Sequence, residues 1–96
     1  MSTFIALVNF TDQGIRNIKE TPGRLAAFQA LAGQLGVTLQ SIHYTIGGYD
    51  LVTVLEGSEA AVTTLLLKVG SLGNVRTQTL RAIPVDEMKA LIAGMP

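Results

Sequence analysis

The segment 37–56, VTLQSIHYTIGGYDLVTVLE, decides the fold of this chain. Two runs rich in β-branched and aromatic residues, 37–46 and 49–56, flank the dipeptide Gly47-Gly48. A Gly-Gly pair between two such runs is typical of a two-residue hairpin. We expect a type I′ turn, in which both central residues adopt positive φ, as glycine does readily. The segment therefore predicts two adjacent antiparallel strands in the middle of the chain.

The turn also fixes which residues stand opposite one another across the hairpin. The expected cross-strand pairs are Ile46 with Tyr49, Thr45 with Asp50, and His43 with Val52. One face of the hairpin then carries polar side chains, namely Ser41, His43, Thr45 and Asp50. The other face is more apolar and is expected to pack on helices; it carries Ile42, Tyr44, Ile46, Tyr49, Leu51 and Leu55.

On either side of the hairpin, strand patterns alternate with helix patterns. The runs Thr3–Phe10 and Asn74–Ile83 have the apolar or Thr-rich and Val-rich character of the first and fourth strands. A helix is expected over about Pro22–Leu35, with Thr21 as its N-cap and Pro22 at the first helical position. These patterns predict one strand and one helix before the hairpin.

A second helix is expected after the hairpin. Ser58 is its N-cap, and Gly70 or Gly73 ends it. Shorter helical stretches are expected around Ile15 and, after Pro84, from near Asp86. The order β-α-β-β-α-β predicts a single α+β domain over residues 1–96, a ferredoxin-like split βαβ. Its four-stranded antiparallel sheet has the first and third strands at the centre.

The first strand is apolar on both faces, since Phe4, Ala6 and Val8 alternate with Ile5 and Leu7. Both long helices of a split βαβ cover one face of the sheet, which leaves the other face bare. A bare apolar face of this size exceeds what monomers usually expose. We therefore expect two copies to pack sheet against sheet as a homodimer, or a larger homo-oligomer to form. The short C-terminal helix is an alternative cover.

Composition excludes several classes of protein. The chain has 96 residues, 48% of them hydrophobic and 15% charged, with seven basic and seven acidic residues. Its zero net charge argues against a nucleic-acid partner, because domains that bind nucleic acid normally carry a surplus of basic residues. There is no cysteine, so disulfides, zinc ribbons and thiol catalysis are excluded. No signal peptide and no apolar window of about 18 residues is present, so we expect a cytoplasmic protein without a membrane partner.

Asp50 and His43 are the candidate catalytic residues. Asp50 follows an aromatic residue at the start of a strand, where a carboxylate could act as a general base or accept a hydrogen bond from a ligand. The competing interpretation is an Asp that stabilises the turn by accepting backbone N–H bonds or pairing with an Arg. His43 is the only histidine and could exchange protons, oriented by Asp50 across the hairpin. A hydrogen-bonded surface or interface histidine is the alternative.

Three further residues are candidate ligand contacts. Tyr49 could donate its phenol hydrogen to a ligand, or could simply bury its ring and leave the hydroxyl in water. Arg76 could hold a carboxylate or phosphate, or could form a salt bridge, with Asp50 as one partner; Arg24 is the other arginine considered for that bridge. Asn9 interrupts the apolar first strand near its end, so its amide needs a partner, either a ligand or the following turn.

The sequence predicts neither a metal nor a cofactor. One histidine, no cysteine and scattered carboxylates lack the spacing of metal ligands. The glycines between Gly70 and Gly73 do not form a nucleotide loop, because no strand precedes them and no GxGxxG or P-loop pattern is present. A haem would have only His43 or a methionine as its axial ligand.

The chain resembles the GYD-domain family over nearly its whole length. The tripeptide Gly48-Tyr49-Asp50 gives that family its name. The other matching segments are 7–11, 14–19, 21–22, 36–37, 48–52, 71–77 and 79–82, together with Arg24. The resemblance implies a small bacterial or archaeal protein of the dimeric α/β-barrel group, and it implies no settled activity.

Three functions remain open from the sequence. The first is a homo-oligomer that binds a small organic ligand in an apolar cleft between the sheet and its cover, near Tyr49, Asp50, His43 and Arg76. The second is a cofactor-free enzyme on a small carbonyl or aromatic compound, with Asp50 or His43 as the base and Arg76 stabilising an oxyanion. The third is a structural or regulatory assembly domain that lacks a pocket.

Overall fold

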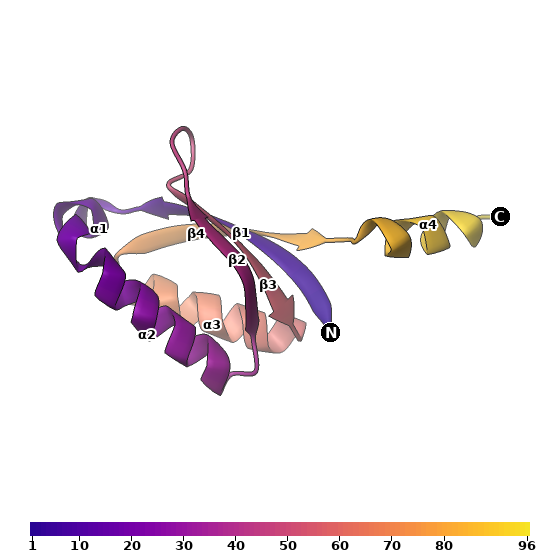
Figure 1. Ribbon diagram of the computed structural model, residues 1–96, viewed down its shortest axis with the longest axis horizontal. Helices are drawn as coiled ribbons and strands as arrows, with labels where there is room; N and C mark the ends of the chain where they lie inside the picture. Colours follow the sequence, from indigo (N-terminus) through magenta and orange to yellow (C-terminus); the bar gives the residue numbers. More distant parts are fainter.

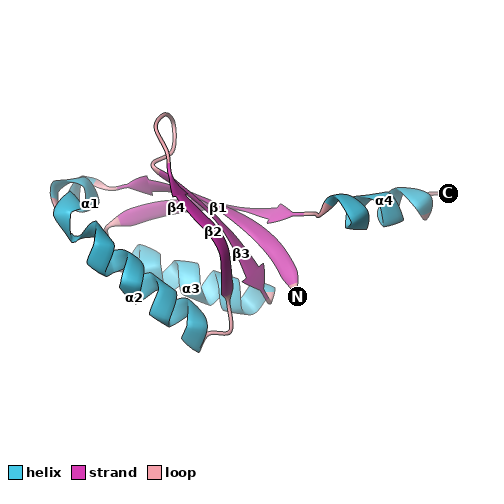
Figure 2. Ribbon diagram, in the orientation of Figure 1, coloured by secondary structure: helices cyan, strands magenta, loops and turns pink.

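The computed structural model describes residues 1–96 and confirms the ferredoxin-like α+β fold (Figure 1). The elements, in chain order, are β1 (Ser2–Phe10), α1 (Asp12–Arg16), a 3-10 turn η1 (Ile18–Glu20), α2 (Thr21–Gln34), β2 (Thr38–Tyr44), β3 (Leu51–Gly57), α3 (Glu59–Ser71), β4 (Val75–Ala82) and α4 (Val85–Ala93). The two long helices, α2 and α3, lie on the same side of the sheet (Figure 2). The arrangement is the expected βαββαβ with an additional terminal helix.

The four strands form one antiparallel sheet in the order β2-β3-β1-β4. The predicted central strands, β1 and β3, are therefore confirmed. Along β1, Phe4, Ala6 and Val8 are buried under the helices, while the alternate residues are half-exposed. The same alternation in β3 buries Thr53 and Leu55. Burial thus alternates with a period of two along both strands, and one face of the sheet belongs to the core.

The hairpin has the predicted register but a different turn. His43 pairs with Val52, as expected, and the ladder ends at Tyr44 and Leu51. The connection is a longer loop that projects from the sheet (Figure 1), not the expected two-residue type I′ turn. A type I′ turn needs positive φ at both central residues, and only Gly47 has it, at +133°.

Asp50 supplies a physical reason for the longer loop. Its backbone N–H donates to the carbonyl of Val8 at 2.9 Å, and its carboxylate accepts from the N–H of Phe10 at 2.9 Å. Both bonds hold the start of β3 against β1. One bond continues the hairpin ladder past Tyr44, from the N–H of Thr45 to the carbonyl of Asp50 at 2.9 Å. A one-residue bulge at Gln40 interrupts the far end of the same ladder.

The helix ends agree with the sequence except at the start of α2. Thr21 is the first helical residue and not the N-cap, because its hydroxyl donates back to the carbonyl of Ile18 at 2.6 Å. Ser58 caps α3 as predicted, accepting from the N–H of Ala61 at 3.1 Å. The left-handed Gly36 (φ +74°) and Gly73 (φ +85°) follow α2 and α3.

The core lies between the sheet and the two helices. Its buried apolar residues are Phe4, Ala6, Val8, Ala32, Val37, Leu55, Val62 and Leu65. Thr53 is the buried polar residue among them, and its hydroxyl donates to the carbonyl of Ser41 at 2.8 Å. Because Leu55 and Leu65 are fully buried, this cluster is where most of the hydrophobic stabilisation of the domain arises.

The sheet face away from the helices, which we call the open face, has nothing packed on it. Its central apolar residues are Ile5, Leu7, Val52, Val54 and Leu80, and none of them is buried. The chain's own α4 does not cover it, because α4 continues outward beyond β4 and away from the sheet (Figure 1). None of the residues of α4 is buried. The chain alone therefore leaves this apolar surface in water.

Candidate functional site

Asn9, Asp50 and Arg76 gather at one end of the sheet. Asn9 and Arg76 are direct cross-strand partners between β1 and β4, so their side chains share the open face. Asp50 lies just before the β3 pairing of Leu51 with Val8. The antiparallel register thus brings three of the five predicted ligand residues to neighbouring positions. Arg76 is exposed and forms no salt bridge.

Asp50 has a structural partner. Beyond the last β1–β3 pair, β3 offers no carbonyl opposite the N–H of Phe10, and the Asp50 carboxylate takes that place at 2.9 Å. The salt bridge considered from the sequence, from Asp50 to Arg76 or Arg24, is not formed, because the only salt bridge joins Arg81 to Glu87. The geometry therefore favours the turn-stabilising interpretation of Asp50.

Neither His43 nor Tyr49 forms an acid–base pair with Asp50. His43 is exposed, pairs with Val52 on the open face and has no side-chain hydrogen bond, so Asp50 does not orient it. Tyr49 leaves the strand geometry, and its hydroxyl donates to Oε1 of Gln78 on β4 at 3.0 Å. That bond places Tyr49 over the open face, whereas the sequence predicted the helix-covered face. The ligand-binding and catalytic roles of these residues stay predictions.

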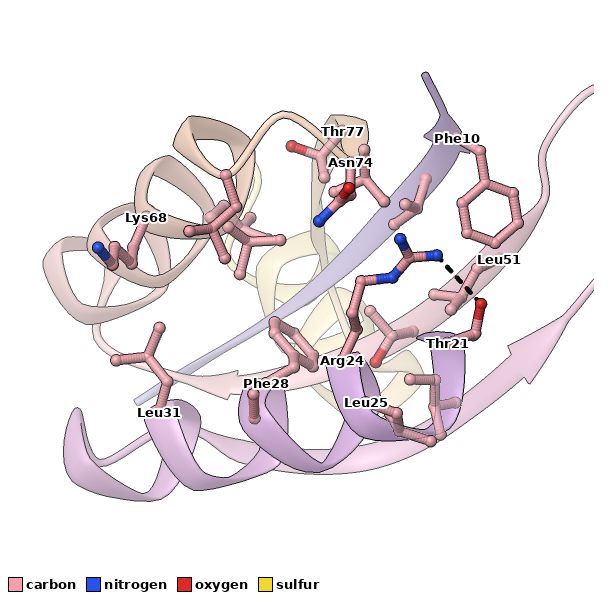
Figure 3. Close-up of a pocket in the computed structure, with 18 of the residues that line it drawn as sticks. Phe10, Thr21, Arg24, Leu25, Phe28, Leu31, Leu51, Lys68, Asn74 and Thr77 are labelled. Atoms are coloured by element: carbon pink, nitrogen blue, oxygen red, sulfur yellow. Dashed lines mark hydrogen bonds between the residues drawn. The ribbon is translucent and has the colours of Figure 1, made fainter. Parts of the chain in front are cut away.

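The cavity of the molecule lies on the opposite side of the sheet. It has a volume of about 360 Å³ and lies between the sheet and the helices α2 and α3, with one side open to solvent (Figure 3). Of its 19 lining residues, 13 are hydrophobic, with Phe28 and Leu31 on α2, Leu51 on β3 and Val69 on α3. None of the five predicted ligand residues lines it, and neither does any Asp, Glu or His.

Arg24 is the polar side chain that distinguishes this cavity. Its Nη2 donates to the carbonyl of Gly14 and to the hydroxyl of Thr21, both at 3.1 Å. Its guanidinium carbon lies 6.0 Å from the centre of the Phe10 ring, within reach of a cation–π contact. Its Nη1 is buried and has no hydrogen-bond partner. Sequence reasoning considered Arg24 only for a salt bridge.

A sequence signal for this position did exist. Arg24 precedes Phe28 and Leu31 by four and seven residues on α2, so it stands on the apolar stripe of that helix. A cation on an apolar stripe needs either a partner or an exit to solvent. The other lining cation, Lys68 on α3, lies well apart from Arg24 (Figure 3).

Tight backbone contacts build the end of the cavity beside Arg24. A Cβ on Gly14 would lie 1.9 Å from the carbonyl oxygen of Asn74, so only glycine allows α1 to approach β4 this closely. The N–H of Thr11 donates to the same carbonyl at 3.0 Å. Nε2 of Gln13 donates to Oδ1 of Asn74 at 3.0 Å. This end of the cavity is therefore fixed by contacts between residues far apart in the sequence.

Other kinds of site are missing from the structure. No three His, Asp or Glu side chains come together as ligands for a metal ion. None of the helices has the length and apolar character needed to span a bilayer.

Comparison with known proteins finds a matching family and a similar protein. The profile of the GYD domain family matches residues 4–92. A "Glutamine synthetase and cystathionine beta-lyase binding protein" from Thermus thermophilus is 38% identical over 92 residues, which cover 94% of this chain and 97% of that protein.

A solved structure is also similar. It is the crystal structure of a candidate glycine cleavage system transcriptional repressor, with a TM-score of 0.52 and 22% sequence identity. The match covers 88% of this chain, which spans only 47% of the length of that one. At this identity the likeness supports the fold alone.

Proposed function

This chain belongs to the GYD-domain family, and on that premise we propose that it is a homo-oligomeric regulatory binding protein. It takes up a small organic ligand in the cavity between the sheet and the helices. It acts by docking on other proteins, metabolic enzymes among them, and does not itself catalyse a reaction.

The wall of the cavity is the observation that carries this proposal. A volume of about 360 Å³ lies at the small end of ligand pockets, which range over roughly 300–1,000 Å³. The wall is mostly apolar and contains no carboxylate or imidazole. General acid–base catalysis most often uses one of these groups within hydrogen-bonding reach of the substrate, and the wall offers only Lys68 and Tyr44 as other proton-transfer groups. The cavity is therefore suited to binding, and the cofactor-free enzyme has less support.

Assembly into a homodimer is supported by the open face. Leu80 is 43% exposed there, and α4 leaves the face uncovered. A second copy offers the same exposed apolar surface, so two sheets can pack face to face around a two-fold axis. Such packing would form the dimeric α/β barrel expected from the sequence.

Docking on enzymes is supported by the Thermus thermophilus relative. That protein is named for binding glutamine synthetase and cystathionine beta-lyase, and the two chains align over almost their entire lengths. Surface plasmon resonance tests whether this chain binds the same two enzymes. Both enzymes are purified from the organism that is the source of this chain. We expect saturable binding to at least one; no binding to either would remove this part of the proposal.

Ligand uptake is tested with matched variants of α2. Ala27 lines the cavity and Ala30, one turn further on, does not; both are exposed. In a heteronuclear NMR titration with the neutral probe octanamide, we expect shifts at Phe28, Leu51 and Val69. Ala27→Phe should abolish these shifts because the ring fills the cavity, whereas Ala30→Phe should preserve them. Absence of shifts in the unmodified protein would overturn the proposed ligand site.

A further inference from the structure

The cavity contains a cation that lacks a partner. Nη2 of Arg24 is satisfied by Gly14 and Thr21, but Nη1 is buried without any acceptor. No carboxylate of the chain forms a salt bridge with this guanidinium. A buried donor without a partner costs free energy, and the cost is larger when the donor carries charge. The guanidinium of Arg24 therefore has no anionic partner within the chain.

The guanidinium is held in place without that anion. The carbonyl of Gly14 anchors one side of it at 3.1 Å, and the Phe10 ring lies 6.0 Å from its carbon. Because Gly14 is itself locked against Asn74, the anchor belongs to the fixed end of the cavity. A pre-positioned arginine loses little conformational entropy when it receives a ligand.

Asn74 provides a second donor beside Arg24. Nε2 of Gln13 donates to the carbonyl of Leu72 at 3.2 Å, which identifies that atom as the amide nitrogen of Gln13. The same nitrogen donates to Asn74 at 3.0 Å, so the acceptor must be the Asn74 oxygen. The amide nitrogen of Asn74 has no hydrogen-bond partner within the chain, and Asn74 lines the same cavity as Arg24 (Figure 3).

We infer that the cavity binds an organic monocarboxylate with an apolar tail. The carboxylate accepts hydrogen bonds from Nη1 of Arg24 and from the Asn74 amide, while Nη2 of Arg24 keeps its bonds to Gly14 and Thr21. The tail lies against Phe28, Leu51 and Val69. One planar guanidinium fork matches one carboxylate, and the only other lining cation, Lys68, lies apart from it. This inference rests on the proposed function and names the class of its ligand.

Two probes of the same shape test the charge requirement. Octanoate and octanamide have the same tail, but only octanoate carries a carboxylate. By NMR titration of the unmodified protein, we expect octanoate to bind at least about tenfold more tightly, as hydrogen bonds to a charged donor imply. Equal affinity would overturn the inference and leave the proposed function standing. Failure of both probes to bind would instead remove the proposed ligand site.

A substitution of the same size tests the charge requirement without disturbing the fold. Asn74→Asp keeps the oxygen that accepts from Gln13 and adds a negative charge beside Arg24. It should abolish the preference for octanoate, preserve binding of octanamide and raise the melting temperature of the free protein. Gln29→Glu, which adds the same charge on the exposed side of α2, should preserve the preference. Retention of the octanoate preference in Asn74→Asp would overturn the inference.

Discussion

The two faces of the sheet differ in shape more than in composition. The face under α2 and α3 is apolar and encloses a cavity of about 360 Å³, with Arg24 at its fixed end. The open face is also apolar at its centre, around Leu7 and Val54, and polar at one end, where Asn9 and Arg76 pair. It carries no comparable enclosed volume.

This difference assigns different partners to the two faces. A concave apolar space removes most of the surface of a small molecule from water, whereas an extended apolar sheet face is best covered by another sheet. The proposed ligand therefore belongs on the helix side, and the proposed second copy belongs on the open face. The polar residues that attract attention in the sequence lie on the face that suits a protein partner.

The largest expected effect comes from the contact that closes the cavity. Gly14→Ala would place a Cβ 1.9 Å from the carbonyl oxygen of Asn74, so α1 must move away from β4. We expect a loss of about 3 kcal/mol or more in the free energy of unfolding, measured by chemical denaturation. The cavity end with Arg24 should be disturbed as well.

Gly23→Ala is the matched control for that experiment. A Cβ at this position of α2 meets no atom within 4 Å, and the backbone is helical. The substitution should raise the free energy of unfolding by about 0.5–1 kcal/mol, because Ala loses less conformational entropy than Gly. Similar losses in both variants would refute the role given to Gly14.

The second prediction compares a lysine introduced on the open face with a lysine introduced on the helix side. Leu80→Lys places a cation on the open face beside Ile5 of the central strand β1, where a partner sheet would bury it. We expect the homodimer to weaken by about 2 kcal/mol or more in sedimentation experiments. Leu67→Lys, on the exposed surface of α3, should leave association unchanged. A protein that is monomeric at micromolar concentration before any substitution would contradict the assignment.

A smaller effect is expected at Asp50. Asp50→Ala removes the acceptor of the Phe10 N–H, so the free energy of unfolding should fall by about 1–2 kcal/mol. Asp50→Asn retains an oxygen at the same position and should lose less. Thermal denaturation of the two variants provides the measurement. If octanamide affinity fell more than stability did, Asp50 would contribute to ligand binding directly.

The smallest effect is expected at His43. Its side chain is exposed on the open face and forms no hydrogen bond, so His43→Ala should change the free energy of unfolding by less than about 0.5 kcal/mol. Ligand affinity should also be unchanged, because His43 does not line the cavity. A loss of ligand affinity in this variant would show that the ligand binds near the hairpin and not in the cavity.

Part of the candidate site could be predicted from the sequence. The bare face was predicted because β1 is apolar on both of its faces, and the hairpin register at His43 and Val52 was correct. The turn type was wrong because the partner of Asp50 is Phe10, a residue forty positions away. No sequence pattern within the hairpin predicts a hydrogen bond to a residue so far away.

Local patterns in the sequence determined the element order, the antiparallel sheet, its central strands and the apolar surface that helices leave uncovered. They suffice because strand and helix periods, caps and glycine stops act over a few residues. The tertiary structure decided where an enclosed space exists and which polar groups lack partners. Arg24 and Asn74 line the same cavity because Arg24 of α2 bonds to Gly14 of α1, and Gly14 lies against Asn74 just before β4. Such long-range contacts have no local signature.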